Sequence, residues 1–234
     1  ALLDRLERKA FGYARWDALG RTLEGGDGPD PQRAHLARVF ETVDVASIRK
    51  RRFRVVLDAC HGGGSTLAPS FLGALGTDAT ILGGTPDGLY DHTPEPTEPN
   101  LRAMTETIAR SGADVGFAQD PDADRLAIID ETGRYIGEEL TLALAARHVL
   151  AQRRGPVVIN LSTSRVVEDV AREHGCPVER TAVGEINVVT RMREIDAVLG
   201  GEGNGGVIDP RVVFVRDSFA GMALVLDLMA KTGE

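Results

Sequence analysis

The sequence predicts an α/β protein with two consecutive three-layer α/β/α domains, each with a mixed, largely parallel sheet, preceded by the helical tail of an earlier domain. Two observations support this prediction. From residue 53 onward, short apolar runs typical of strands alternate with helical patterns, as in layered, mostly parallel sheets. The alternation restarts after Gly155-Pro156. We therefore expect a tail and connecting helix over residues 1–52, and domains over 53–153 and 154–234.

The first 52 residues are mostly polar. A turn-rich stretch, residues 24–31, separates two helical patterns. The second pattern places Leu36, Val39 and Phe40 at helical spacing. Because this segment is too short to close a core by itself, we expect it to be the end of an earlier domain and a connecting helix.

The first α/β unit begins with a strand at 54–58 and a turn of three glycines at 62–64. These glycines fit neither the G-x-G-x-x-G nor the P-loop pattern, so a plain strand-to-helix turn is favoured over a phosphate site. A proline-rich extended connector, residues 93–99, leads to Asn100, which suits a helix N-cap. The remaining expected elements are a helix from residue 101 that Gly112 ends, strands at 115–119, 126–130 and 134–136, and a helix at 138–152.

The second unit is predicted in the same manner. Ser164 suits the N-cap of a helix that ends at Gly175. The last helix is apolar on most faces, so we expect it to be buried. The other expected elements are strands at 157–160, 178–181 and 197–199, and helices at 187–193 and 219–230.

Composition narrows the function classes. The net charge is −8, with 35 acidic and 27 basic residues, so the chain has no basic footprint for nucleic acid. No apolar run approaches the roughly 18 residues of a membrane span. Cys60 and Cys176 lie far apart and form no C-x-x-C pair, which favours a reducing compartment. We expect a cytoplasmic protein without a nucleic-acid or membrane partner.

The most informative motif places Asp120, Asp122 and Asp124 at alternate positions, followed at once by Arg125. Three close carboxylates repel one another unless a cation neutralises them, and oxygen-only ligands favour magnesium, manganese or calcium. The loop lies between two predicted strands. An EF-hand loop would need helices around it and a glycine where Arg125 stands. A merely solvated acidic hairpin remains open.

A second motif lies about eighty residues further on, at 201–206, with the sequence Gly-Glu-Gly-Asn-Gly-Gly. The aspartate loop resembles the Asp-Gly-Asp-x-Asp-Arg metal loop of the α-D-phosphohexomutases, and residues 201–206 resemble their sugar-binding loop. That family includes phosphoglucomutases, phosphomannomutases and phosphoglucosamine mutases. The resemblance covers the chain well from about residue 53 to the C-terminus. It implies the two central domains of such an enzyme.

The resemblance implies Mg²⁺ held by the three aspartates, with Arg125 as a catalytic group near the transferring phosphate. It implies that Glu202, which we expect to be an exposed carboxylate on this loop, accepts hydrogen bonds from two sugar hydroxyls. The alternative is a glycine-rich turn with one exposed glutamate and no sugar contact. Sugar-binding positions expected from it are Glu202, Gly203, Asn204, Thr181 and Gly184. The substrate would be a hexose phosphate, interconverted between its 1- and 6-phosphates.

The sequence also departs from the family. Asn204 and Gly206 replace a Ser and a His of the family's loop, which leaves the sugar preference open. The phosphoserine motif of a first domain and the phosphate-gripping loop of a fourth do not occur in this sequence, so both domains are expected to be missing partners. Two alternatives stay open: a magnesium-dependent phosphatase or phosphotransferase with Asp120 as nucleophile, and a carbohydrate-binding module stabilised by a divalent cation.

Overall fold

The computed structural model describes residues 2–18, 20 and 30–233. The chain forms two compact units, residues 1–30 and residues 31–234. In the first unit, a short helix α1 (Leu2–Glu7) and a 3₁₀ turn η1 (Trp16–Ala18) are described. Most of the predicted turn-rich stretch 24–31 lies outside the described residues. The second unit contains all the strands and the remaining described helices.

The first sheet has the strand order β2-β1-β3-β4. Strands β1, β2 and β3 are parallel, and β4 is antiparallel to β3. The bounds are β1 (Arg54–Asp58), β2 (Asp78–Leu82), β3 (Val115–Gln119) and β4 (Leu126–Ile129). The sheet is therefore mixed and largely parallel, as expected.

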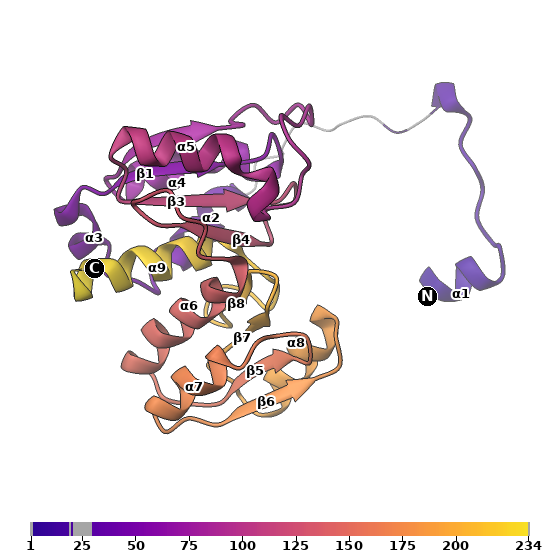
Figure 1. Cartoon of the computed structure of the whole chain (residues 1–234). Helices are drawn as coiled ribbons and strands as arrows, with labels where there is room; N and C mark the ends of the chain where they lie inside the picture. Colours follow the sequence, from indigo (N-terminus) through magenta and orange to yellow (C-terminus); the bar gives the residue numbers. More distant parts are fainter. Residues whose placement is uncertain (1, 19, 21–29, 234) are drawn as a thin grey trace. The chain divides into compact units, whose positions relative to one another are not determined.

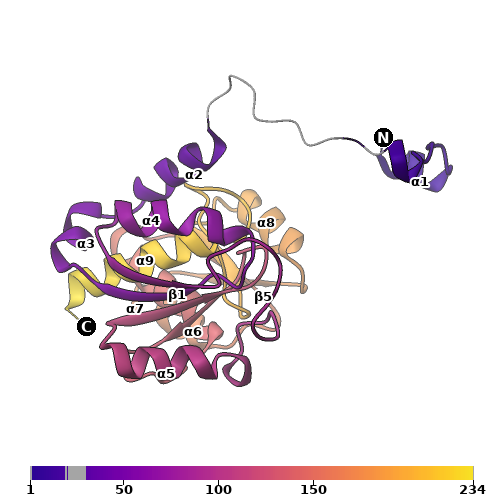
Figure 2. The same cartoon turned by 90° about the horizontal axis from the view of Figure 1, so that it is seen from above.

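Helices cover both faces of this sheet (Figure 2). Side chains along β1 alternate between the faces: Val55 and Leu57 join one core cluster with Phe71, while Val56 joins another with Met104. The helices of this half are α2 (Pro31–Phe40), α3 (Val45–Arg51), α4 (Ala68–Ala74) and α5 (Arg102–Ser111), with η2 (Gly63–Thr66) and η3 (Glu98–Asn100) as short 3₁₀ turns.

The second sheet repeats the topology of the first, with the order β6-β5-β7-β8 and β8 antiparallel to β7. Helix α8 packs on one face and α6 and α7 on the other. The bounds are β5 (Val157–Asn160), β6 (Val178–Thr181), β7 (Leu199–Glu202), β8 (Gly206–Ile208), α6 (Glu138–Gln152), α7 (Val166–Glu173), α8 (Glu185–Glu194) and α9 (Ser218–Thr232). The prediction of two three-layer α/β/α arrangements is confirmed.

Two long helices, α6 and α9, lie between the two sheets (Figure 1). Helix α6 follows β4 of the first sheet, but its apolar residues, such as Leu142 and Val149, belong to the core cluster of the second sheet. Helix α9 follows β8 of the second sheet, and its residues Phe219 and Met222 belong to the core cluster of the first. Each half therefore contributes a helix to the other's core. The boundaries at residues 52 and 153 stay predictions.

Several local predictions were wrong. Asn100 ends η3 and bonds back to Glu95 and Thr97, while α5 begins two residues later. The hydroxyl of Ser164 makes no cap, because α7 begins at Val166. The stretch 134–136 forms a single bridge, at Tyr135, rather than a strand. Strand β2 was not foreseen, because it is an edge strand whose exposed residues lack apolar alternation.

Among the described helices, none is both long enough and apolar enough to cross a lipid bilayer.

Candidate metal and sugar site

The two sequence motifs occupy equivalent places in the two sheets. The aspartate loop connects β3 to β4, and the glycine-rich loop connects β7 to β8. Both therefore follow the carboxyl end of a parallel strand, where ligands of open α/β sheets bind. The two loops also touch, because the N–H of Leu126 donates to the carbonyl of Gly205 at 3.2 Å.

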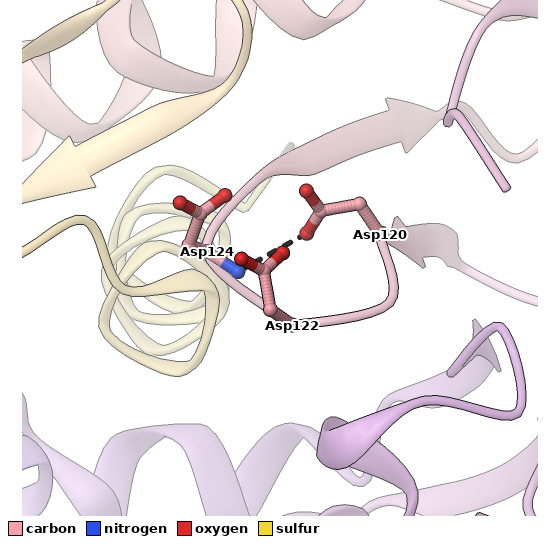
Figure 3. A group of neighbouring side chains, drawn as sticks. All are labelled: Asp120, Asp122 and Asp124. Atoms are coloured by element: carbon pink, nitrogen blue, oxygen red, sulfur yellow. Dashed lines mark hydrogen bonds between the residues drawn. The ribbon is translucent and has the colours of Figure 1, made fainter. Parts of the chain in front are cut away.

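The three aspartates converge on one side of their loop (Figure 3), where each offers a carboxylate oxygen within 4.8 Å of the others. Asp120 is buried and anchors the loop: its Oδ1 accepts the backbone N–H groups of Asp124 and Arg125, at 3.1 and 3.0 Å. Asp122 is exposed and Asp124 half-buried. The predicted ligand set is thus brought together, with two members open to solvent.

The electrostatics of the cluster are unfavourable without a cation. Burial, followed by the negative charge of Asp120, raises the pKa of Asp124 to about 6, although Arg216 opposes the shift. The raised pKa means that the site disfavours the charged form of this carboxyl group, and a bound cation would stabilise that form. The donors are all oxygens, which suits a hard divalent cation. The residues present therefore fit a metal of this class.

Arg125 is placed against the cluster. Its Nε donates to Asp120 Oδ2 at 2.6 Å, and it lies 3.9 Å from Asp124 Oδ1. Among the described residues, no side chain accepts a hydrogen bond from its two terminal η nitrogens, although the charges of Asp120, Asp124 and Glu95 act on the guanidinium. The arginine thus screens the carboxylates through one nitrogen and keeps its planar fork available for an anion.

The glycine turn after β1 supports the aspartate loop. The N–H of Gly63 donates to the carbonyl of Pro121 at 2.8 Å, and a Cβ at Gly62 would overlap that same carbonyl. Glycine is required here for the close approach of two backbones. This turn therefore has a structural role, as the sequence pattern indicated.

Glu202 differs from the expected exposed loop residue. It is the last residue of β7, and only 4% of its surface is accessible. Its Oε1 accepts from the side-chain amide of Asn160 at 2.7 Å and from the N–H of Gly184 at 3.3 Å, and its Oε2 pairs with Arg216 at 2.8 Å. Buried carboxylates need such partners, and neither Asn160 nor Arg216 lies near Glu202 in sequence.

The other expected sugar-binding residues are only partly gathered. Gly184 bonds to Glu202 as described, and the side chain of Asn204 caps its own loop by accepting from Gly206 N–H at 3.3 Å. Gly203 is buried, and its lack of a side chain makes room for Glu139. Thr181 donates its hydroxyl to the neighbouring carbonyl of Ala182, at 3.0 Å.

Arg216 is the residue that sequence reasoning missed. It lies between β8 and α9, and its guanidinium contacts Asp124 through Nη2, Glu202 through Nη1 and Glu185 through Nε. The only signal in the sequence is Asp217, which caps the strongly apolar helix α9 by accepting two backbone N–H groups. A cap of that type indicates that a loop precedes the helix. It does not indicate that Arg216, the residue before the cap, contacts three carboxylates.

A pocket of about 470 Å³ opens beside the aspartate loop. Its lining includes Asp122, Arg216 and the glycine turn at Gly63, together with His35 from α2. A volume of this size falls within the range of small-molecule sites.

Comparison with known proteins agrees with this arrangement. The family model described as phosphoglucomutase/phosphomannomutase, alpha/beta/alpha domain II, matches residues 33–133. The model of alpha/beta/alpha domain III of the same family matches residues 137–234.

Individual relatives carry related names. A "Phosphoglucomutase/phosphomannomutase" of Thermococcus kodakarensis is 37% identical over 96% of this chain and 49% of its own length. A "Probable phosphoglucosamine mutase" of Methanopyrus kandleri is 33% identical over 94% of this chain and 48% of its own length. The crystal structure of a phosphoglucomutase/phosphomannomutase family protein from Burkholderia thailandensis superposes with a TM-score of 0.77, at 28% identity, over 86% of this chain and 44% of that one.

The chain spans about half the length of the curated relatives it matches. Both family models match in the order of their domains, and together they cover most of the chain. The chain therefore belongs to the phosphoglucomutase/phosphomannomutase family, of which it holds the second and third domains.

Proposed function

We propose that this chain provides the divalent-metal centre and the sugar-binding face of a phosphohexomutase, which interconverts hexose 1-phosphates and hexose 6-phosphates. One observation carries the proposal: three aspartate oxygens lie within 4.8 Å of one another, on a loop in contact with the loop that follows Glu202. A phosphoryl group and a sugar ring need such neighbouring sites.

The proposed reaction moves the phosphate between two positions of the hexose by two phosphoryl transfers. A phosphoserine gives its phosphoryl group to the free hydroxyl of the hexose phosphate, which becomes a bisphosphate. The sugar then turns, and its other phosphate returns to the serine. The family resemblance assigns this serine to a domain whose motif this sequence lacks. Magnesium, the cation we propose, would neutralise the transferring group and make it a better electrophile.

The residues of this chain would then position the reactants. Asp120, Asp122 and Asp124 would hold the cation, and the terminal nitrogens of Arg125 could contact a phosphate oxygen as a fork. Glu202 would accept hydrogen bonds from sugar hydroxyls with the lone pairs that Arg216, Asn160 and Gly184 leave free.

Three further positions would complete the sugar site. They are the amide of Asn204, the backbone of Gly203 and the hydroxyl of Thr181, and the side chains of Asn204 and Thr181 would need to turn from Gly206 and Ala182, their present partners, toward the ring.

The phosphatase alternative has less support. Asp120 would be its nucleophile, but only 1% of its surface is accessible, and its two oxygens already accept three hydrogen bonds. A carboxylate so engaged is a poor nucleophile, because the reaction would break those bonds. No observation specifically favours a carbohydrate-binding module.

The substrate class is a hexose phosphate, with mannose, glucose and glucosamine phosphates as candidates. We also propose a cytoplasmic location, which is supported by the two free cysteines, Cys60 and Cys176.

A coupled assay tests the proposal. We expect a polypeptide extended at both ends by the family's first and fourth domains to interconvert at least one of these hexose phosphates with magnesium. The 234-residue chain alone should give no appreciable turnover, because positioning and charge neutralisation supply most of phosphoryl-transfer catalysis. Robust turnover by the chain alone would make one of its own side chains the nucleophile and would contradict the proposal.

A further inference from the structure

Arg216 contacts carboxylates on three separate segments. Asp124 belongs to the aspartate loop of the first sheet, Glu202 ends β7 of the second sheet, and Glu185 begins α8. Only 19% of the side-chain surface of Arg216 is accessible to solvent, and only 6% of the side-chain surface of Glu202. The guanidinium is therefore a largely buried positive charge shared by three negative ones.

A shared charge of this kind is subject to competition. A guanidinium keeps its charge at all practical pH values and presents its N–H groups in a rigid fork. When one of the three carboxylates binds a metal cation, its attraction to the arginine weakens. The arginine can then bind the other two carboxylates more strongly. Asp124 is the partner with such an option, because it belongs to the three-aspartate cluster that fits a divalent cation.

We propose that Arg216 couples cation binding at the aspartate loop to the glycine-rich loop between β7 and β8, which we call the sugar loop. Cation binding weakens the ion pair of Arg216 with Asp124 and strengthens its ion pair with Glu202. The inference rests on the proposed metal site and adds a positioning role for a residue that touches neither sugar nor phosphate in the proposal above. Such coupling is reciprocal, so a change at Glu202 must alter cation affinity through Arg216.

The alternative is that Arg216 only fills space and balances charge. In that case Glu202 affects cation binding only through its own field, which does not require the arginine. A double-mutant cycle separates these cases, because a direct field effect is the same with and without Arg216.

The experiment measures Mn²⁺ and Mg²⁺ dissociation constants by calorimetry in this chain and in the variants Glu202→Gln, Arg216→Ala and their combination. With Arg216 present, removing the charge of Glu202 turns the arginine more fully toward Asp124. We therefore expect Glu202→Gln to weaken cation binding about tenfold, which corresponds to about 1.4 kcal/mol. In the Arg216→Ala background the same change should weaken it by about twofold or less.

A second readout follows the sugar loop directly. Hydrogen exchange of the amides at residues 203–206 should slow on cation addition in the parent chain and stay unchanged in Arg216→Ala. If Arg216→Ala does not fold, Arg216→Lys replaces it, because the single nitrogen of an ammonium cannot occupy the three separate positions from which Nε, Nη1 and Nη2 reach the three carboxylates. Arg191→Ala is the charge-matched control, since Arg191 pairs with Glu179 and Glu194 instead.

Equal weakening by Glu202→Gln in both backgrounds, with measurable cation binding, would overturn the coupling and leave the metal site standing. Absence of cation binding in the parent chain would overturn both the coupling and the metal centre of the proposed function.

Discussion

The carbonyl oxygen of Gly205 accepts a hydrogen bond from the N–H of Leu126 at 3.2 Å, so the glycine-rich loop between β7 and β8 contacts the first residue of β4. Gly205 has a φ of +87°, and a Cβ there would overlap the carbonyl oxygen of Leu126. The contact between the two loops therefore depends on a glycine, for reasons of both backbone conformation and space.

We expect Gly205→Ala to lower the free energy of unfolding by about 2 kcal/mol or more, because strain and overlap act together. Chemical denaturation measures this. The control is Gly73→Ala in α4, where a Cβ meets nothing within 4 Å and the helix should gain up to about 1 kcal/mol. If both variants unfolded at the same denaturant concentration, the proposed contact between the loops would be wrong.

Asp122 offers the cleanest test of metal binding. It is exposed, whereas Asp120 also holds the loop backbone, so replacing Asp120 would disturb folding as well. At a magnesium concentration one hundred times the dissociation constant, binding adds about 2.7 kcal/mol. For a chain of this size that corresponds to a rise of about 5–10 °C in Tm.

Asp122→Asn should abolish most of that rise, because one ligand and one charge are lost. Asp169→Asn, on the surface of α7 and paired with Arg172, should leave it intact. Calorimetry that gave the same magnesium response in Asp120→Asn, Asp122→Asn and Asp124→Asn would show that the cation binds elsewhere.

Glu202 illustrates where the sequence was insufficient. Its position after two glycines indicated an exposed turn, because local composition reports the flexibility of the backbone and not what packs on it. Its partners Asn160, Gly184 and Arg216 lie 14 to 42 residues away. Their convergence depends on the register of two parallel strands and on the loop before α9, and no local pattern encodes either.

More of the fold than of the site could be predicted from the sequence. Strand β3 was predicted with its observed bounds, Val115–Gln119, and helix α6 likewise, at Glu138–Gln152, because each combines a clear apolar pattern with turn residues at both ends. The exchange of α6 and α9 between the two cores was not predicted. An apolar helix face indicates that it is buried, but not against which sheet.

We expect Glu202→Gln to destabilise the chain, contrary to what an exposed residue would predict. The change leaves Arg216 with one buried partner fewer, which should cost about 1–3 kcal/mol. Urea denaturation measures the loss, and Glu173→Gln, an exposed position on α7, is the matched control. In an active extended polypeptide, Glu202→Ala should also lower kcat/KM by about two decades, since two charged hydrogen bonds to the sugar would be lost.

Two histidines, His61 and His92, hold the loop between β2 and η3 through hydrogen bonds. His61 contacts the carbonyl of Thr85 at 2.9 Å and Asp91 at 3.1 Å, and His92 contacts the carbonyl of Thr93 and Asp58, both at 2.8 Å. Each ring therefore faces an acceptor on both nitrogens, which only the doubly protonated imidazolium satisfies.

The pKa of each ring is correspondingly raised above its ordinary value of 6.5. For His61 the main cause is the hydrogen bond to Asp91. For His92 burial acts in the opposite direction, but the Thr93 carbonyl and Asp58 outweigh it. A raised pKa in the folded state means that the stabilisation is complete below about pH 6.5 and is lost as pH rises through the folded value.

The loop over residues 84–97 should therefore open more readily as pH rises from 6 to 8.5, while the sheets stay folded. Hydrogen exchange, corrected for the intrinsic pH dependence of each amide, should report reduced protection in this loop at the higher pH and constant protection in β1 and β3. Asp58→Asn, which removes the anionic partner of His92, should reduce protection at pH 6 and make it less dependent on pH. Equal protection of the loop at both pH values in the parent chain would mean that neither imidazolium holds it.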